Sequence, residues 1–186
     1  ESLGVRIVRL PELPDYPDAV FVEDTALVLD EVAVLTRPGA ESRRGEVDAM
    51  AEALAPFRRT VRIPGEATLD GGDVLRLGRT LYVGRSRRTP AEGVAALGAL
   101  VAPYGYEVRE VPVRGALHLK SAATQVGPEW ILVNPEWVDA AHFEGYDALT
   151  VDAGEPFAAN AVLVNGAVVH STAFPRTQAM LRAHGI

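Results

Sequence analysis

Short apolar runs recur along this 186-residue chain, and each recurrence has the same internal order. In the first of them, residues 21–29 and 32–36 have the pattern of a β-hairpin. Residues 46–54 then place apolar side chains at helical spacing, and residues 61–63 are a short β-branched run. The pattern predicts a unit made of a hairpin, a helix and a closing strand.

The same order returns three times. Unit starts near Phe21, Asp70, His118 and Ala158 lie about 40 to 50 residues apart, a spacing typical of propellers and solenoids. The further predicted strands and helices are residues 73–77, 80–83, 90–101 and 106–113, then 118–126, 130–133 and 148–151, then 161–164, 167–169 and a helix from 175 onward. A strand at residues 4–10 and a Pro- and Asp-rich loop at 11–18 precede the first unit, and no strand follows the last helix. If the units close into a ring, we expect material to be missing at both ends.

Two adjacent carboxylates, Glu23 and Asp24, stand inside the first apolar run. A strand buried on both faces points neighbouring side chains in opposite directions, so at least one of the two must enter packed protein. A buried carboxylate is costly unless a cation or donor meets it. We therefore expect a positive group nearby, and a buried salt bridge to an arginine is the simplest interpretation.

Polar residues stand at or beside the first strand of each later unit as well. They are Asp70 and Asp73 around Gly71 and Gly72, His118 and Lys120, and Asn160. In a radial arrangement these groups would converge on one pocket. Each also has a structural interpretation: Gly71-Gly72 as a bulge, His118 as a hydrogen-bonded core histidine, Asp73 as support for a turn, and the pairs Arg43-Arg44 and Arg87-Arg88 as exposed helix-entry charges.

Composition narrows the function. The chain is 48% hydrophobic and 23% charged, and no apolar segment approaches the ~18 residues of a membrane span. A net charge of −7 without a basic stripe argues against a nucleic-acid partner and fits a cationic small molecule. The absence of cysteine excludes disulfides and Cys-based metal sites from these residues, and the cytoplasm is the expected location.

Six motifs in register resemble the dimethylarginine dimethylaminohydrolase family of the guanidino-group-modifying (pentein) superfamily. They are the stretches 21–24, 36–46, 69–74, 88–89, 118–121 and 175–177. The resemblance implies a single α/β domain over 1–186, a five-bladed α/β propeller of pseudo-fivefold symmetry with about four of five units present. It implies hydrolysis of methylated arginine to citrulline and methylamine or dimethylamine through a covalent cysteine intermediate, with no metal and no organic cofactor.

The resemblance also assigns roles to individual residues. His118 matches the general acid and base, and Asp70 and Asp24 match carboxylates that grip the guanidinium, so His118 and Asp70 are the predicted catalytic residues. The predicted substrate contacts are Asp18, Phe21, Glu23, Asp24, Arg43 and Arg88, of which the two arginines would bind the amino-acid end of the substrate. Such roles suit a planar cation that carboxylates can orient.

One departure from the family pattern is serious, because the family nucleophile is a cysteine and these residues contain none. We therefore expect a truncated enzyme whose present residues bind weakly and turn over nothing. Arginine deiminase or an amidinotransferase on the same scaffold is the first alternative, and a non-catalytic propeller that serves as a binding module is the second. Family members are often dimers, so a homodimer is among the expected assemblies.

Overall fold

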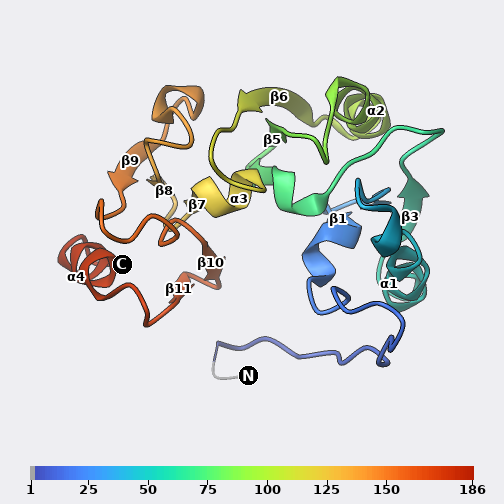
Figure 1. The fold of residues 1–186 in the computed structure, drawn as a ribbon, viewed down its shortest axis with the longest axis horizontal. Helices are drawn as coiled ribbons and strands as arrows, with labels where there is room; N and C mark the ends of the chain where they lie inside the picture. Colours follow the sequence, from blue (N-terminus) through green and yellow to red (C-terminus); the bar gives the residue numbers. More distant parts are fainter. Residues whose placement is uncertain (1–2) are drawn as a thin grey trace. The chain divides into compact units, whose positions relative to one another are not determined.

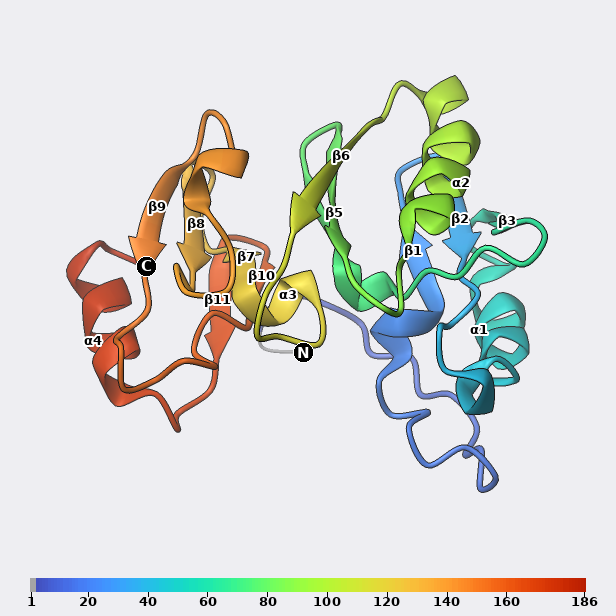
Figure 2. The ribbon, with the colours of Figure 1, turned by 45° about the horizontal axis from the view of Figure 1, so that its top comes forward.

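The computed structural model describes residues 3–186, which divide into two compact units. One unit is Val8–Glu110, and the other combines the residues up to Ile7 with Val111–Ile186. Each unit contains two of the repeats that the sequence predicts (Figures 1 and 2). No helix among the described residues has the length and apolar character needed to cross a membrane.

The first repeat is a three-stranded sheet with one helix. Strands β1 (Ala26–Val28) and β2 (Val32–Leu35) form an antiparallel hairpin, and β3 (Arg59–Arg62) pairs with β2 in parallel. Helix α1 (Glu46–Leu54) connects β2 to β3, as its apolar spacing predicts. All four residues of β2 are buried, so the central strand of this sheet supplies core on both faces.

The second repeat has the same order. Its elements are β4 (Val74–Leu77), β5 (Thr80–Arg85), α2 (Ala91–Val101) and β6 (Glu107–Pro112). The three strands form a sheet in the order β4-β5-β6, with β4 and β5 antiparallel. Leu69, Val74, Leu81, Val83 and Leu97 belong to one core cluster that also contains residues of β1 and β2, which packs the first two repeats together.

The other unit holds the third and fourth repeats. Their elements are α3 (Leu119–Ala122), β7 (Ala123–Gln125), β8 (Trp130–Val133) and β9 (Asp147–Thr150), then β10 (Ala161–Val164), β11 (Ala167–His170) and α4 (Pro175–Ala183). The connection between β8 and β9 contains only the short 3₁₀ helix η5 (Ala140–His142). Asn165 and Gly166 both have positive φ, as a tight two-residue hairpin turn requires, and they join β10 to β11. The order of hairpin, helix and strand is thus confirmed for the first two repeats, whereas the third has a 3₁₀ helix in place of the α-helix and the fourth consists of a hairpin and a helix.

The start of each of the first three repeats differs from the prediction. Residues 22–25 and 119–122 form short helical turns rather than strand, as η1 (Val22–Thr25) and α3. In the second repeat the turn η3 (Gly71–Asp73) includes Asp73, so the strand β4 begins one residue later than predicted. The prediction that Glu23 and Asp24 lie within a buried strand is therefore wrong. The Thr25 hydroxyl donates to the Val22 carbonyl at 2.8 Å, which closes the turn locally where a strand would need a ladder partner.

One smaller prediction also fails. The structure has no strand at residues 5–10, so apolar alternation alone was insufficient to predict one there. The 3₁₀ helix η2 (Glu41–Arg43) lies shortly before α1, and Gly45 is the residue that precedes α1. Pro90 precedes α2, and the hydroxyl of the neighbouring Thr89 accepts a hydrogen bond from the Asp70 N–H. The remaining 3₁₀ helix is η4 (Ala102–Tyr104).

Glu155 anchors the start of α4. Its buried carboxylate accepts hydrogen bonds from the backbone N–H groups of Arg176 at 3.0 Å and Thr177 at 2.8 Å. Burial by itself raises the pKa of Glu155, but the hydrogen bonds from Thr177 and Arg176 outweigh it and lower the pKa from 4.5 to about 2. The ionised carboxylate therefore satisfies two N–H groups of the first helical turn that have no partner within the helix.

The Glu155 contact predicts a pH dependence of stability. Because the folded-state pKa lies below the unfolded one, the contribution of Glu155 is complete above about pH 4.5 and disappears as the pH falls toward about 2. Urea unfolding followed by circular dichroism should show that Glu155→Gln destabilises the protein at pH 7 and flattens this dependence. Glu129→Gln, at an exposed position of the same unit, should change neither. Equal pH profiles for Glu155→Gln and the unmodified protein would contradict the assignment.

Candidate active site

The first site carboxylate, Asp24, is buried at the start of the first repeat. One of its oxygens, Oδ1, accepts a hydrogen bond from the Gly72 N–H at 2.9 Å. The other, Oδ2, accepts from Arg43 Nη1 at 2.6 Å. The buried salt bridge that the sequence predicts for this stretch is confirmed, and its partner is Arg43.

Arg43 is buried as well, and it holds several groups together. Its Nη2 donates to Glu46 Oε2 at 2.8 Å, and to the carbonyl oxygens of Asp18 at 3.1 Å and Phe21 at 3.0 Å. Its Nε lies 3.1 Å from both oxygens of Glu46. Burial alone would lower the pKa of Arg43, but the hydrogen bonds to Glu46 and Asp24 raise it above its ordinary value. The guanidinium thus stays charged and fixes the loop before η1.

The second carboxylate, Asp70, is fully buried at the start of the second repeat. Its Oδ1 accepts from the Gly39 N–H at 2.8 Å, and its own backbone N–H donates to the Thr89 hydroxyl at 3.1 Å. Arg88 Nη1 lies 3.5 Å from Asp70 Oδ2, and the Arg88 side chain is 31% exposed. Arg88 is therefore a half-accessible cation beside a buried carboxylate.

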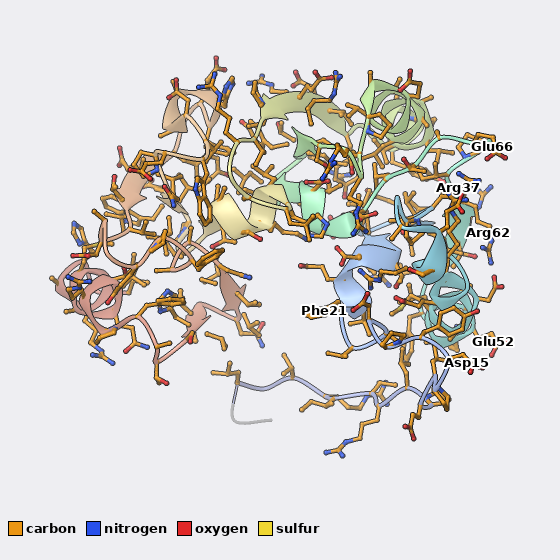
Figure 3. All side chains as sticks on the ribbon, viewed as in Figure 1. Asp15, Phe21, Arg37, Glu52, Arg62 and Glu66 are labelled. Atoms are coloured by element: carbon orange, nitrogen blue, oxygen red, sulfur yellow. The ribbon has the colours of Figure 1, made fainter. Side chains whose placement is uncertain are left out.

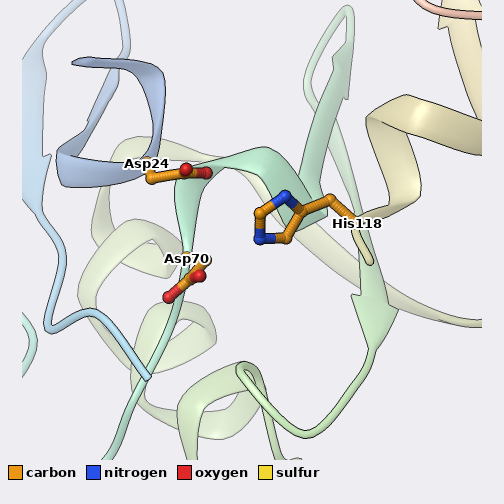
Figure 4. Close-up of side chains that lie close together, drawn as sticks. All are labelled: Asp24, Asp70 and His118. Carbon is orange, nitrogen blue, oxygen red and sulfur yellow. The ribbon is translucent and has the colours of Figure 1, made fainter. Parts of the chain in front are cut away.

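Asp24 and Asp70 come close together (Figure 4). One carboxylate oxygen of each lies within 4.8 Å of the other. Two like charges at this distance repel each other, and Arg43 and Arg88 offset that repulsion. Each of the two carboxylates thus has a guanidinium neighbour, the planar hydrogen-bond donor that suits a carboxylate.

Gly71 explains how the two carboxylates approach. A Cβ at Gly71 would lie 2.0 Å from the Glu23 carbonyl oxygen, so η1 and η3 pack with backbone against backbone. Gly71 is thus required for a close backbone contact, and no bulge is needed to explain it. Asp73 accepts a hydrogen bond from the Ser86 hydroxyl at 2.8 Å, which confirms the interpretation of Asp73 as support for a turn.

The predicted substrate contacts on the loop before η1 face solvent. Asp18, Phe21 and Glu23 are exposed, and the Phe21 side chain, labelled in Figure 3, is 58% exposed. Arg43 donates hydrogen bonds to the carbonyl groups of Asp18 and Phe21 and to the Asp24 carboxylate. One guanidinium therefore connects this loop to Asp24. The contacts of Glu46 with Arg43 and of Gly39 with Asp70 were not predicted from the sequence. The spacing of Glu46 three residues after Arg43, in the first turn of a helix, was the available signal.

His118 lies in the other compact unit, within its segment Val111–Ile186. It directly precedes α3 in an extended conformation, and its carbonyl accepts the Ser121 N–H at 3.1 Å. His118 as a whole is half-buried. Figure 4 also draws this side chain. His118 therefore leads into a short helix rather than standing within a strand.

The chain is similar in sequence and in structure to several known proteins. The chain is 34% identical over 180 residues to an N(G),N(G)-dimethylarginine dimethylaminohydrolase from Pseudomonas aeruginosa, covering 96% of the chain and 71% of that protein. A protein of the same name from Streptomyces coelicolor is 49% identical over 128 residues, covering 67% of the chain and 50% of that protein. No family model matches the chain.

The solved structures agree. A cysteine-to-serine variant of the Pseudomonas aeruginosa enzyme in complex with citrulline superposes with a TM-score of 0.87 at 34% identity, covering 92% of the chain and 68% of that structure. An amidinotransferase from Microseira wollei, at 18% identity, and the N-terminal domain of a cyanobacterial arginine dihydrolase, at 22%, share the fold with TM-scores of 0.80. The predicted class, a mixed α/β propeller-like fold of the pentein type, is confirmed. The chain belongs to the dimethylarginine dimethylaminohydrolase family.

The Arg43 network predicts a large loss of stability when it is broken. Arg43→Ala removes the guanidinium that pairs with the buried carboxylates of Asp24 and Glu46, and we expect the free energy of unfolding to fall by about 3–5 kcal/mol. Arg62, on β3 in Figure 3, pairs with Asp48 at 2.7 Å in solvent, so Arg62→Ala should cost less than about 1 kcal/mol. Urea unfolding measures both. Similar losses for the two variants would contradict a special role of Arg43.

The close approach at Gly71 predicts a second difference. Gly71→Ala forces η1 away from η3 and should cost about 1–3 kcal/mol of unfolding free energy. Gly98→Ala, inside α2, is the matched control. The added Cβ would make only ordinary contacts, at 3.9 Å, with Val108 of β6. Alanine favours a helix over glycine, so this control should stabilise the protein by up to ~1 kcal/mol in the same unfolding experiment. A Gly71→Ala variant as stable as the unmodified protein would show that the backbone contact is not required.

Proposed function

We propose that these residues bind a methylated arginine and take part in its hydrolysis to citrulline and methylamine or dimethylamine. The observation that carries the proposal is the pair of buried carboxylates, Asp24 and Asp70, with oxygens within 4.8 Å of each other. Membership of the dimethylarginine dimethylaminohydrolase family supports the reaction. A guanidinium is planar, cationic and rich in N–H donors, so it matches two adjacent carboxylates in both charge and hydrogen bonding.

In this proposal the carboxylates orient the substrate. Asp70 and Asp24 accept N–H groups of the guanidinium and draw positive charge toward its central carbon. Arg88, half-exposed beside Asp70, binds the carboxylate at the amino-acid end, and Asp18, Phe21 and Glu23 add contacts from the exposed loop. The hydrogen bonds of Arg43 favour a different task from the predicted one. They suit a residue that holds Asp24 and the loop in place. We therefore propose a positioning role for Arg43 instead of a direct contact with the substrate.

The bond that breaks joins the guanidinium carbon to the methylated nitrogen. A thiolate adds to that carbon, His118 protonates the departing amine, and a covalent thiouronium remains. His118 then takes a proton from water, which adds to the same carbon and releases citrulline and the thiol. The 186 residues contain no cysteine, so the thiol is not among them. The cysteine-to-serine variant of the Pseudomonas aeruginosa relative, seen with citrulline, supports a thiol in this chemistry.

The alternatives have weaker support. Arginine deiminase or amidinotransferase activity rests on structural likeness at 18–22% identity, which shows the fold alone. A non-catalytic binding module would not need two buried carboxylates within 4.8 Å of each other. A homodimer, the lack of a nucleic-acid partner and a cytoplasmic location stay predictions.

Isothermal titration calorimetry tests the proposal directly. We expect dimethylarginine and citrulline to bind to these residues and lysine, which has no guanidino or ureido group, to bind much more weakly. Asp70→Asn removes a charged hydrogen-bond acceptor and should weaken dimethylarginine binding about tenfold or more. Asp48→Asn is the control, because Asp48 is an exposed carboxylate of the same unit. Equal affinity for lysine, or no effect of Asp70→Asn, would overturn the assignment. Citrulline production by these residues alone would contradict the thiol step.

A further inference from the structure

The loop that leads to His118 lies against one segment of the same compact unit. The Arg114 N–H donates to the Trp137 carbonyl oxygen at 2.9 Å. The next residue, Gly115, has φ of +69°, and a Cβ there would lie 2.7 Å from both Cδ1 and Nε1 of the Trp137 indole. Only glycine meets both conditions, a left-handed backbone and a close approach to a rigid ring. The contacts with Trp137 thus fix the backbone direction of the loop that leads to His118.

The Trp137 segment also contacts the far end of the turn. The Asn134 N–H donates to the carbonyl of Ala122, the last residue of α3, at 2.8 Å. His118 stands between the two contact points, since Arg114 and Gly115 precede it and α3 follows it. Residues 134–137 therefore contact the segment 114–122, which contains His118, at both of its ends.

The supporting segment is itself fixed. Asn134 is buried, its side-chain nitrogen donates to the Pro156 carbonyl at 2.9 Å, and its side-chain oxygen accepts the Glu136 N–H at 3.0 Å. The Trp137 ring packs edge to face against Phe157, with ring centroids 4.9 Å apart. The Trp137 N–H donates to the Asn134 carbonyl at 3.1 Å, so the two anchors are joined.

We propose that Trp137, seated on Gly115 and fixed by Asn134, is a positioning residue for the His118 imidazole. The inference rests on the proposed function, which makes His118 the acid and base. Proton transfer needs a donor or acceptor within hydrogen-bond reach, and a displacement of about 1 Å can cost a hundredfold in rate. A histidine on a short loop reaches such accuracy only if packed neighbours fix its backbone.

NMR of protein labelled at the histidine ring tests the proposal on the chain as it stands. The chain has four histidines, and His118→Gln assigns the His118 signal. In the absence of ligand, Gly115→Ala and Trp137→Ala should each displace or broaden the His118 ring signal, whereas His170 and His184, on β11 and after α4, should keep theirs. Trp137→Phe retains an aromatic ring and should restore most of the original signal. The matched control is Gly145→Ala, because Gly145 also has positive φ but nothing lies within 4 Å of the added Cβ.

The outcomes separate the inference from the proposed function. An unchanged His118 signal in Gly115→Ala and Trp137→Ala, or an equal change in Gly145→Ala, would overturn the positioning role. If Gly115→Ala fails to fold, the comparison of Trp137→Ala with Trp137→Phe decides in the same way. Addition of citrulline to the unmodified protein tests the proposed function separately, since a bound ureido group should shift the His118 signal. Absence of that shift removes the acid and base role, and the ligand-free spectra still show whether Trp137 fixes the His118 ring.

Discussion

The first site carboxylate depends on one buried guanidinium. Arg43 binds Asp24, Glu46 and two backbone carbonyls, and so joins the start of α1, the turn η1 and the loop before it. A buried ion pair contributes less to net stability than an apolar replacement of the same shape, because desolvation offsets much of the attraction. Its value here is geometric, since it fixes an ionised carboxylate where apolar packing would exclude one.

Asp70 is held by a different device. A backbone N–H from Gly39 and the half-accessible Arg88 meet its carboxylate, and its own N–H is satisfied by Thr89. Gly71 and Gly72 then bring η3 against η1, and the Gly72 N–H reaches Asp24. Two carboxylates from two repeats are thereby brought within 4.8 Å of each other, although neither could be buried as a charge by itself. In the proposed function this arrangement prepares the site for a cation before the substrate arrives.

The repeats could be predicted from the sequence because apolar periodicity and turn residues determine them. The bounds of α1 and the Asn165-Gly166 hairpin follow from such local signals. The helical turns η1 and α3 could not be predicted, because they run directly into the strands β1 and β7 and only tertiary contacts decide where each strand begins. The residues with unusual chemistry, Asp24, Asp70 and His118, were visible as polar groups in apolar surroundings. Glu46 and Trp137 were not, because a glutamate early in a helix and a tryptophan after a strand are common in structural roles.

A crystal structure of the protein with dimethylarginine or citrulline would test the central claim most directly. The account predicts that the guanidinium or ureido N–H groups lie within hydrogen-bond distance of the Asp24 and Asp70 carboxylates, with the Arg43 contacts unchanged. A ligand bound through other groups, or a guanidinium that displaces Arg43 from Asp24, would show that these carboxylates are structural and that substrate recognition lies elsewhere.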